Sequence, residues 1–228
     1  MMLPEYWLER PHVEFNEKTK LSFDALLKSA LAPGVNPVIE YKLPNPKWQF
    51  LCYLAEHQGI ALHGSGNPNI TLFEPRQPVD LSEFGNQKAV YAAADGIWAM
   101  FFAIIDRDQY EMSITNACIR LVDQEGNTSG PFYQFSMSKT VLERQPWRIG
   151  TVYLLPRTTF IEQPPMSFGS SQVQIAQLAS LSSVQPFARL QVSANDFPFL
   201  KQIRGHDDSR LQEYATALQT GAPWPDDQ

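Results

Sequence analysis

The spacing of apolar positions predicts three helices in the first half of the chain. Residues 22–31 and residues 46–59 each carry one apolar face at helical spacing, and prolines or glycines bound both segments. Residues 96–105 are apolar nearly all round, which indicates a buried helix. Asp95 stands directly before this segment and is expected to be its N-cap, because its carboxylate can accept from the first backbone N–H groups.

Shorter apolar runs predict strands around and after these helices. Residues 60–62 and 88–93 are expected to be buried strands. Further strands are expected at residues 112–122, 132–137, 151–155, 175–181 and 187–192. A last helix is expected over residues 208–218. Early helices followed by late strands indicate an α+β fold, with residues 1–46 as an arm carrying a short helix and residues 47–228 as a single domain.

Composition narrows the class of ligand. The chain carries 24 acidic and 18 basic side chains, a formal net charge of −6, and no cluster of lysines and arginines. The electrostatic footprint for DNA or RNA is therefore missing, and we expect no long nucleic acid among the partners. A small-molecule nucleotide remains compatible with this charge balance.

The cysteines and histidines indicate whether a metal site is expected, and the apolar runs indicate whether a signal peptide or a membrane helix is expected. Cys52 and Cys118 form no CxxC pair and the four histidines are scattered, which argues against a structural zinc site. The N-terminus lacks a basic start followed by an apolar run, so no signal peptide is expected. The longest apolar stretch, residues 97–105, is too short to span a bilayer. We therefore expect a cytoplasmic protein with no membrane partner.

Two short motifs lie where strands are expected to end. His63-Gly64-Ser65 is expected in a turn after the strand at 60–62, where the glycine would let the backbone approach a ligand closely. The imidazole and hydroxyl suit a ribose or a phosphate, although such a triplet also occurs by chance. Tyr91 offers either a stacking surface for a flat ligand or a core ring with a satisfied hydroxyl.

Together the two motifs carry a resemblance to a known family. A helix, the strand with His63-Gly64-Ser65, a long loop, the strand with Tyr91 and a capped buried helix follow one another. Over residues 60–106 this order resembles the N-terminal half of the ADP-ribosyltransferase superfamily, in its His–Tyr–Glu group. The resemblance implies NAD as the ligand, with the first motif at the ribose and Tyr91 at the nicotinamide. It also implies split, mostly antiparallel sheets that face each other across a cleft, with helices packed outside.

The resemblance implies a third motif, in which a catalytic glutamate bonds the ribose and stabilises an oxocarbenium-like transition state. Gln177 stands nearest to that position, with Gln172 and Gln174 as alternatives. A glutamine makes the hydrogen bond but supplies no negative charge. Glu162 follows an apolar strand and would either supply the missing carboxylate or be a solvated loop residue.

Two further polar segments leave alternatives open. Arg76 lies in the loop after the first motif, where it would pair with the pyrophosphate of a dinucleotide or with a surface carboxylate. Residues 204–208 are typical of a helix cap, with Gly205 in the left-handed conformation and an aspartate capping the next helix. The alternative places His206 near the pocket as an acid, a base or a ligand contact.

Other classes of hydrolase and nucleotide-binding protein lack their motifs. Ser65 is not in a Gly-x-Ser-x-Gly elbow, because the residue two before it is His63. Neither a Gly-x-Gly-x-x-Gly after a strand nor a P-loop is present. We expect an NAD-binding protein that transfers ADP-ribose to an unidentified acceptor, with Gln177 or Glu162 acting at the ribose carbon. The alternatives are a non-catalytic module that binds NAD or ADP-ribose, and a structural protein with coincidental motifs.

Overall fold

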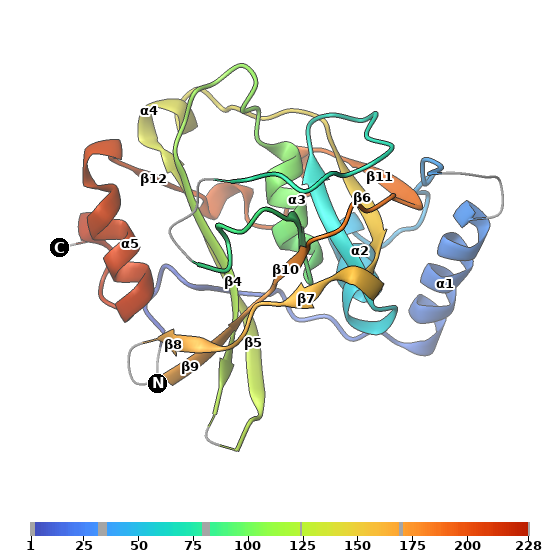
Figure 1. The fold of residues 1–228 in the computed structure, drawn as a ribbon, viewed down its shortest axis with the longest axis horizontal. Coiled ribbons are helices and arrows are strands. Elements are labelled where there is room, and N and C mark those ends of the chain that lie inside the picture. Colours follow the sequence, from blue (N-terminus) through green and yellow to red (C-terminus); the bar gives the residue numbers. More distant parts are fainter. Residues whose placement is uncertain (1–2, 32–35, 79–82, 124, 169–170, 228) are drawn as a thin grey trace.

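A computed structural model describes residues 3–31, 36–78, 83–123, 125–168 and 171–227 (Figure 1). Its helices are α1 (Glu17–Leu31), α2 (Lys47–His57), α3 (Gly96–Ile104), α4 (Lys139–Leu142) and α5 (Leu211–Thr220). The strands up to the middle of the chain are β1 (Leu8–Glu9), β2 (Ile60–Ser65), β3 (Val90–Ala93), β4 (Ile114–Val122), β5 (Thr128–Ser138) and β6 (Gly150–Pro156). The later strands are β7 (Ile161–Glu162), β8 (Met166–Phe168), β9 (Ser171–Ile175), β10 (Gln177–Ser180), β11 (Ala188–Val192) and β12 (Arg204–His206).

The strands form two sheets, so the chain has the mixed α+β architecture that its sequence predicts. The first sheet has the order β1-β5-β4-β9-β8, and β12 lies beside β5. The second sheet has the order β11-β6-β2-β3-β10-β7. Within the described residues the strand pairings are antiparallel except for that of β12 with β5, which is parallel.

Helix α3 lies between the two sheets, near the centre of the molecule in Figure 1. On one side it contacts the first sheet, where the rings of Phe101 and Phe135 lie 4.7 Å apart and the Trp98 indole donates to Asn116 Oδ1 at 2.6 Å. On the other side it packs against β2 and β6. The expectation that the helices pack outside the sheets is therefore wrong for α3, because a helix that is apolar all round must be covered on all sides.

Glycines bring α3 into backbone contact with its neighbours. A Cβ atom at Gly64 in β2 would lie 1.9 Å from the carbonyl oxygen of Ala99, and one at Gly150 in β6 would lie 1.9 Å from that of Ala103. At Gly96, the first residue of α3, a Cβ atom would meet the backbone of α2 at 2.5 Å. These close approaches hold α3 between the second sheet and α2.

Asp95 is the N-cap of α3, as predicted. Its carboxylate accepts from the backbone N–H of Trp98 at 2.8 Å and from the hydroxyl of Tyr133 in β5 at 2.7 Å. Burial raises the pKa of Asp95, and these two hydrogen bonds oppose the rise. The side chain therefore links the start of α3 to the first sheet as well as capping the helix.

Some predicted elements differ from the structure in their bounds or in the sheet they join. Helix α1 begins at Glu17 rather than at residue 22, because the side chain of Asn16 accepts from the N–H of Thr19 and caps an earlier turn. The strand expected at 175–181 is two strands, β9 and β10, that belong to different sheets. Ala176 makes the crossing, since its N–H donates to Cys118 O in the first sheet and its carbonyl accepts from Ala94 beside the second.

The last predicted helix also begins later. A 3₁₀ turn at Asp208–Arg210 precedes α5, which starts at Leu211. At the other end of the chain, Phe23 of α1 is fully buried in the main core and Tyr6 packs on Trp224 near the C-terminus. Both cysteines are buried and free. Within the described residues no helix could cross a membrane and no group of three potential metal ligands occurs.

Replacing Asp95 by alanine should lower the free energy of unfolding by about 2–3 kcal/mol, as measured by urea titration. The change removes the cap of α3 and leaves the buried hydroxyl of Tyr133 without its acceptor. Tyr133→Phe should give a smaller loss, because it keeps the cap and removes one hydrogen bond. Equal losses for the two variants would show that the cap contributes nothing to stability.

Candidate functional site

A cleft opens where β2 and β3 part. Their register holds one Cα pair within the described residues, Leu62 opposite Ala93, and beyond it the strands no longer pair. The cleft has a volume of about 610 Å³, within the range of small-molecule sites. Its walls come from the end of β2, from β3, from α3 and from the start of β10.

Most of the predicted site residues line this one cleft, although they lie far apart in the sequence. The predicted residues found there are His63, Gly64, Ser65, Arg76, Tyr91 and Gln177. Glu162 is absent from the lining and lies in β7, the edge strand next to β10. The structure therefore brings together the residues of three separate motifs and leaves the alternative carboxylate outside.

His63 is held by the strand beside it. The motif His63-Gly64-Ser65 lies within β2, paired with β6, and not in the expected turn. The Nδ1 atom of His63 lies 2.7 Å from the carbonyl oxygen of Tyr91, which can only accept, so Nδ1 carries the proton. In the neutral ring Nε2 is then the acceptor, suited to a ribose hydroxyl.

The surroundings of His63 favour this neutral form. Burial lowers the pKa of His63, the positive charge of Arg76 lowers it further, and the hydrogen bond to Tyr91 opposes both. The imidazole also packs on Phe73, with ring centroids 4.6 Å apart. At neutral pH the ring is therefore a fixed hydrogen-bond acceptor.

The other two residues of the motif differ in what they do. Gly64 is required for the contact with α3, where a side chain would overlap Ala99, which accounts for the glycine without a ligand. The Ser65 hydroxyl accepts from the N–H of Asn67 at 3.1 Å, so its own proton remains to be donated. Within this motif, His63 and Ser65 carry the polar groups that a ligand could use.

The hydroxyl of Tyr91 is hydrogen-bonded to the loop that precedes β3. The hydroxyl donates to the carbonyl oxygen of Phe84 or of Gln87, at 2.8 and 3.0 Å, and accepts from the N–H of Gln87. The side chain is half-buried and lines the cleft. The hydroxyl is therefore held by the preceding loop, and the side chain contributes an aromatic ring to the wall of the cleft.

Gln177 lies beside Tyr91 on the same face of the sheet. In the register of β10 with β3, Gln177 pairs with Ala93 and Ala179 pairs with Tyr91, and residues two apart on a strand share a face. The two alternatives, Gln172 and Gln174, lie in β9 of the first sheet. Of the three glutamines, Gln177 is therefore the one that faces the cleft, and it brings an amide without charge.

Glu162 has a different partner. Its carboxylate is 62% exposed and pairs with Arg157, five residues before it. It belongs to the second sheet, where Glu162 lies opposite Leu178. The side chain is solvated, as one alternative expected, but Glu162 lies in a strand and not in a loop.

The sequence did not reveal the other charged groups of the cleft. Arg107, Asp108 and Arg148 line it together with the predicted Arg76. They lie just after α3 and just before β6, in segments without a recognisable motif. Three arginines against one carboxylate make the cleft favourable for an anion, although the whole chain is acidic.

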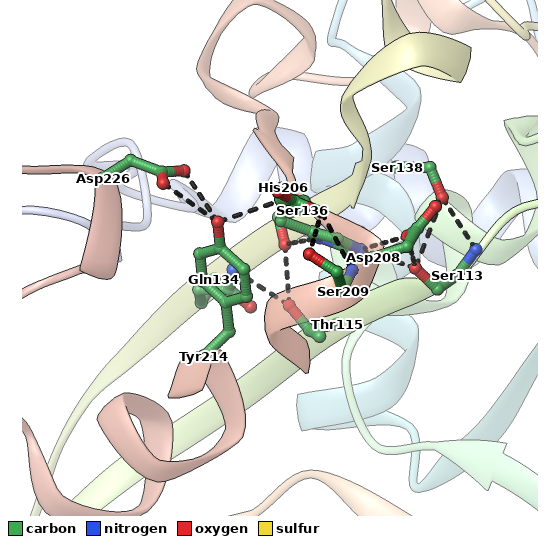
Figure 2. Close-up of polar contacts among 11 residues, drawn as sticks. Ser113, Thr115, Gln134, Ser136, Ser138, His206, Asp208, Ser209, Tyr214 and Asp226 are labelled. Carbon is green, nitrogen blue, oxygen red and sulfur yellow. Dashed lines mark hydrogen bonds and ion pairs between the residues drawn. The ribbon is translucent and has the colours of Figure 1, made fainter. Parts of the chain in front are cut away.

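His206 lies elsewhere, in a polar cluster at the end of the first sheet (Figure 2). It is 1% exposed, and its ring nitrogens each lie 2.7 Å from a serine hydroxyl, Nδ1 from Ser136 and Nε2 from Ser113. Asp208 accepts from the hydroxyls of Ser113 and Ser138 and lies 3.4 Å from His206 Nε2. These bonds attach the end of β12 and the segment after it to β5 and to the residue before β4.

The cap predicted around His206 is right in part. Asp207 caps the 3₁₀ turn by accepting from the N–H of Ser209 at 2.9 Å. Gly205 is not in the left-handed conformation; it lies in β12, beside Lys139. His206 is absent from the lining of the cleft, so the alternative that places it near the pocket is wrong.

The stability of the protein should depend on pH through His206. Burial lowers its pKa below the ordinary 6.5, and the charges of Asp208, Asp226 and Asp207 oppose this. A histidine with a lowered pKa in the folded state stabilises the fold above pH 6.5, and this contribution is lost as the pH falls through the folded-state pKa. His206→Gln should therefore be less stable than the wild type at pH 7.5, and the difference should shrink toward pH 5 in urea titrations. A difference that stays constant would exclude the lowered pKa.

The comparisons with known proteins identify no relative of this chain. No protein-family model, no curated protein and no solved structure matches this chain.

Proposed function

We propose that the cleft binds NAD or its ADP-ribose part. The observation that carries this proposal is the convergence of His63, Tyr91 and Gln177, from three strands of the second sheet, on one cleft. The resemblance to ADP-ribosyltransferases rests on sequence motifs, and it requires these three side chains to line the same cleft. The strands could have directed the three side chains to separate regions of the molecule.

The chemistry of the lining matches the parts of a dinucleotide. The ring of Tyr91 offers a surface for the nicotinamide, and His63 and Ser65 offer an acceptor and a donor for ribose hydroxyls. The arginines offer bidentate donors to the pyrophosphate. Trp98 and Phe102 of α3 add apolar surface. Each class of group that NAD presents has a complementary partner in the cleft.

The absence of a glutamate favours binding over cleavage. Breaking the bond between nicotinamide and ribose develops positive charge on the ribose, which a carboxylate stabilises and an amide does not. Gln177 holds the place next to Tyr91, and Glu162 lies outside the lining of the cleft, bound to Arg157. The chain therefore acts as an NAD-binding or ADP-ribose-binding module.

ADP-ribosyl transfer is the second candidate, and one observation favours it. Gln177 lines the same cleft as Tyr91, and its side chain is as long as the glutamate that the third motif of the family carries. In this version His63 and Ser65 hold the ribose and Gln177 bonds a ribose hydroxyl. The bond between the ribose carbon and nicotinamide breaks, nicotinamide leaves, and a nucleophile of an unidentified acceptor forms the new bond to that carbon.

Removing the ring of Tyr91 should weaken NAD binding. Tyr91→Ala should raise the dissociation constant about five- to tenfold in calorimetry, since aromatic contacts contribute on the order of 1 kcal/mol beyond area burial. The matched control is Tyr110→Ala. Tyr110 is a half-buried tyrosine that stacks on Arg144 and does not line the cleft. Equal effects of the two variants would contradict the placement of the ligand.

The two candidate functions differ in what Gln177 does. We expect the wild type to bind NAD without releasing nicotinamide, and Gln177→Ala to release no less. Nicotinamide release by the wild type above that of Gln177→Ala would contradict the binding module and support the transferase. For a transferase, Gln177→Glu should raise the rate further by adding the negative charge.

A further inference from the structure

Arg148 differs from the other arginines of the cleft in its close packing against Gly66. Its side chain is 18% exposed, although it lies in a connection between elements. Its guanidinium fills the space above Gly66, where a Cβ atom would lie 1.7 Å from the guanidinium carbon. Residue 66 therefore has to be a glycine for Arg148 to occupy this position.

Among the described residues, Nη1 is the one nitrogen of the Arg148 guanidinium that has a side-chain partner. Nη1 pairs with Asp108 at 2.5 Å and lies 3.6 Å from Asp106. Within the described residues no hydrogen bond reaches Nε or Nη2, and Nε is buried. Because Nε is buried, a ligand in the cleft meets the guanidinium at Nη1 and Nη2, and Nη1 is the donor that Asp108 occupies.

The bond that Arg148 donates to Asp108 is easy to replace. The Asp108 side chain is 82% exposed, and a pair with such a partner contributes little to stability. Asp106 is different, because it is buried and also accepts from the N–H of Gln109. A phosphate that approaches Arg148 therefore competes with Asp108, while Asp106 keeps the guanidinium in place.

We propose that Arg148 is the main phosphate-binding residue of the cleft and that Asp108 is a competing carboxylate that the phosphate displaces. This inference rests on the proposed function, and it specifies the ligand as one with two linked phosphates. Arg76 and Arg107 line the same cleft and can bind a second phosphate, so a diphosphate gains more than a single phosphate does. A nucleoside without phosphates gains nothing from Arg148.

Calorimetry at low ionic strength tests the proposal with ADP-ribose, inorganic pyrophosphate and adenosine as probes. Asp108→Asn should tighten the binding of ADP-ribose and of pyrophosphate roughly three- to tenfold, because it removes both the competitor and a like charge. It should leave adenosine unchanged. The control is Glu125→Gln, which removes the same charge in the turn between β4 and β5.

Two variants of the arginine site test the geometry. Arg148→Gln should weaken ADP-ribose binding by about tenfold or more, since charge-assisted hydrogen bonds are lost. Arg144→Gln, at an arginine that stacks on Tyr110 outside the cleft, is its control. Gly66→Ala should weaken binding without any change of charge, because the new methyl group pushes the guanidinium aside.

The outcomes distinguish a failure of the proposed function from a failure of the roles given to Asp108 and Arg148. If the wild type binds neither NAD nor ADP-ribose, the proposed function fails and this inference falls with it. If the wild type binds ADP-ribose but Asp108→Asn matches Glu125→Gln, the cleft binds nucleotide and the role of Asp108 is wrong. If Arg148→Gln matches Arg144→Gln, the phosphates lie elsewhere. Tighter binding of pyrophosphate than of ADP-ribose would identify a free diphosphate, and not a nucleotide, as the ligand.

Discussion

The structure depends on the position of α3 between the two sheets. Gly64 and Gly150 allow β2 and β6 to approach the helix so closely that a methyl group at either position would overlap a helix carbonyl. Asp95 fixes the other side by binding both the start of the helix and Tyr133 in β5. A helix with no polar face has no stable place at the surface, so these contacts decide where the two sheets can lie.

The cleft is a consequence of this packing. Helix α3 lines the cleft with Trp98, Ala99 and Phe102. The strands that pack on this helix, β2 and β3, stop pairing with each other at the cleft. The hydrogen bond from His63 to the Tyr91 carbonyl joins the two strands where the ladder between them has ended. His63, Tyr91 and Gln177 are therefore held by strands that also contribute to the core, whereas the arginines of the cleft lie in connections between elements.

Rules that use neighbouring residues predicted most helices and strands, but they did not predict which sheet each strand joins. The cap at Asp95 and the buried character of α3 follow from composition, since neighbouring residues determine both. The strand at 175–181 reads as one apolar run, yet Ala176 divides it between two sheets, because strand pairing depends on distant partners. Gly64 was expected to serve a ligand, and its close contact with α3 requires a glycine there in any case. Arg107, Asp108 and Arg148 follow no motif, and tertiary structure alone brings them to the cleft.

Hydrogen–deuterium exchange with and without NAD tests most directly the claim that this cleft is the ligand site. The account predicts slower exchange in residues 62–66 and 89–93 and around Arg107 and Arg148 when NAD is bound. It predicts no change in residues 204–214, which hold the separate cluster around His206. Protection confined to residues 204–214, or NAD binding with no protection of β2 and β3, would contradict it.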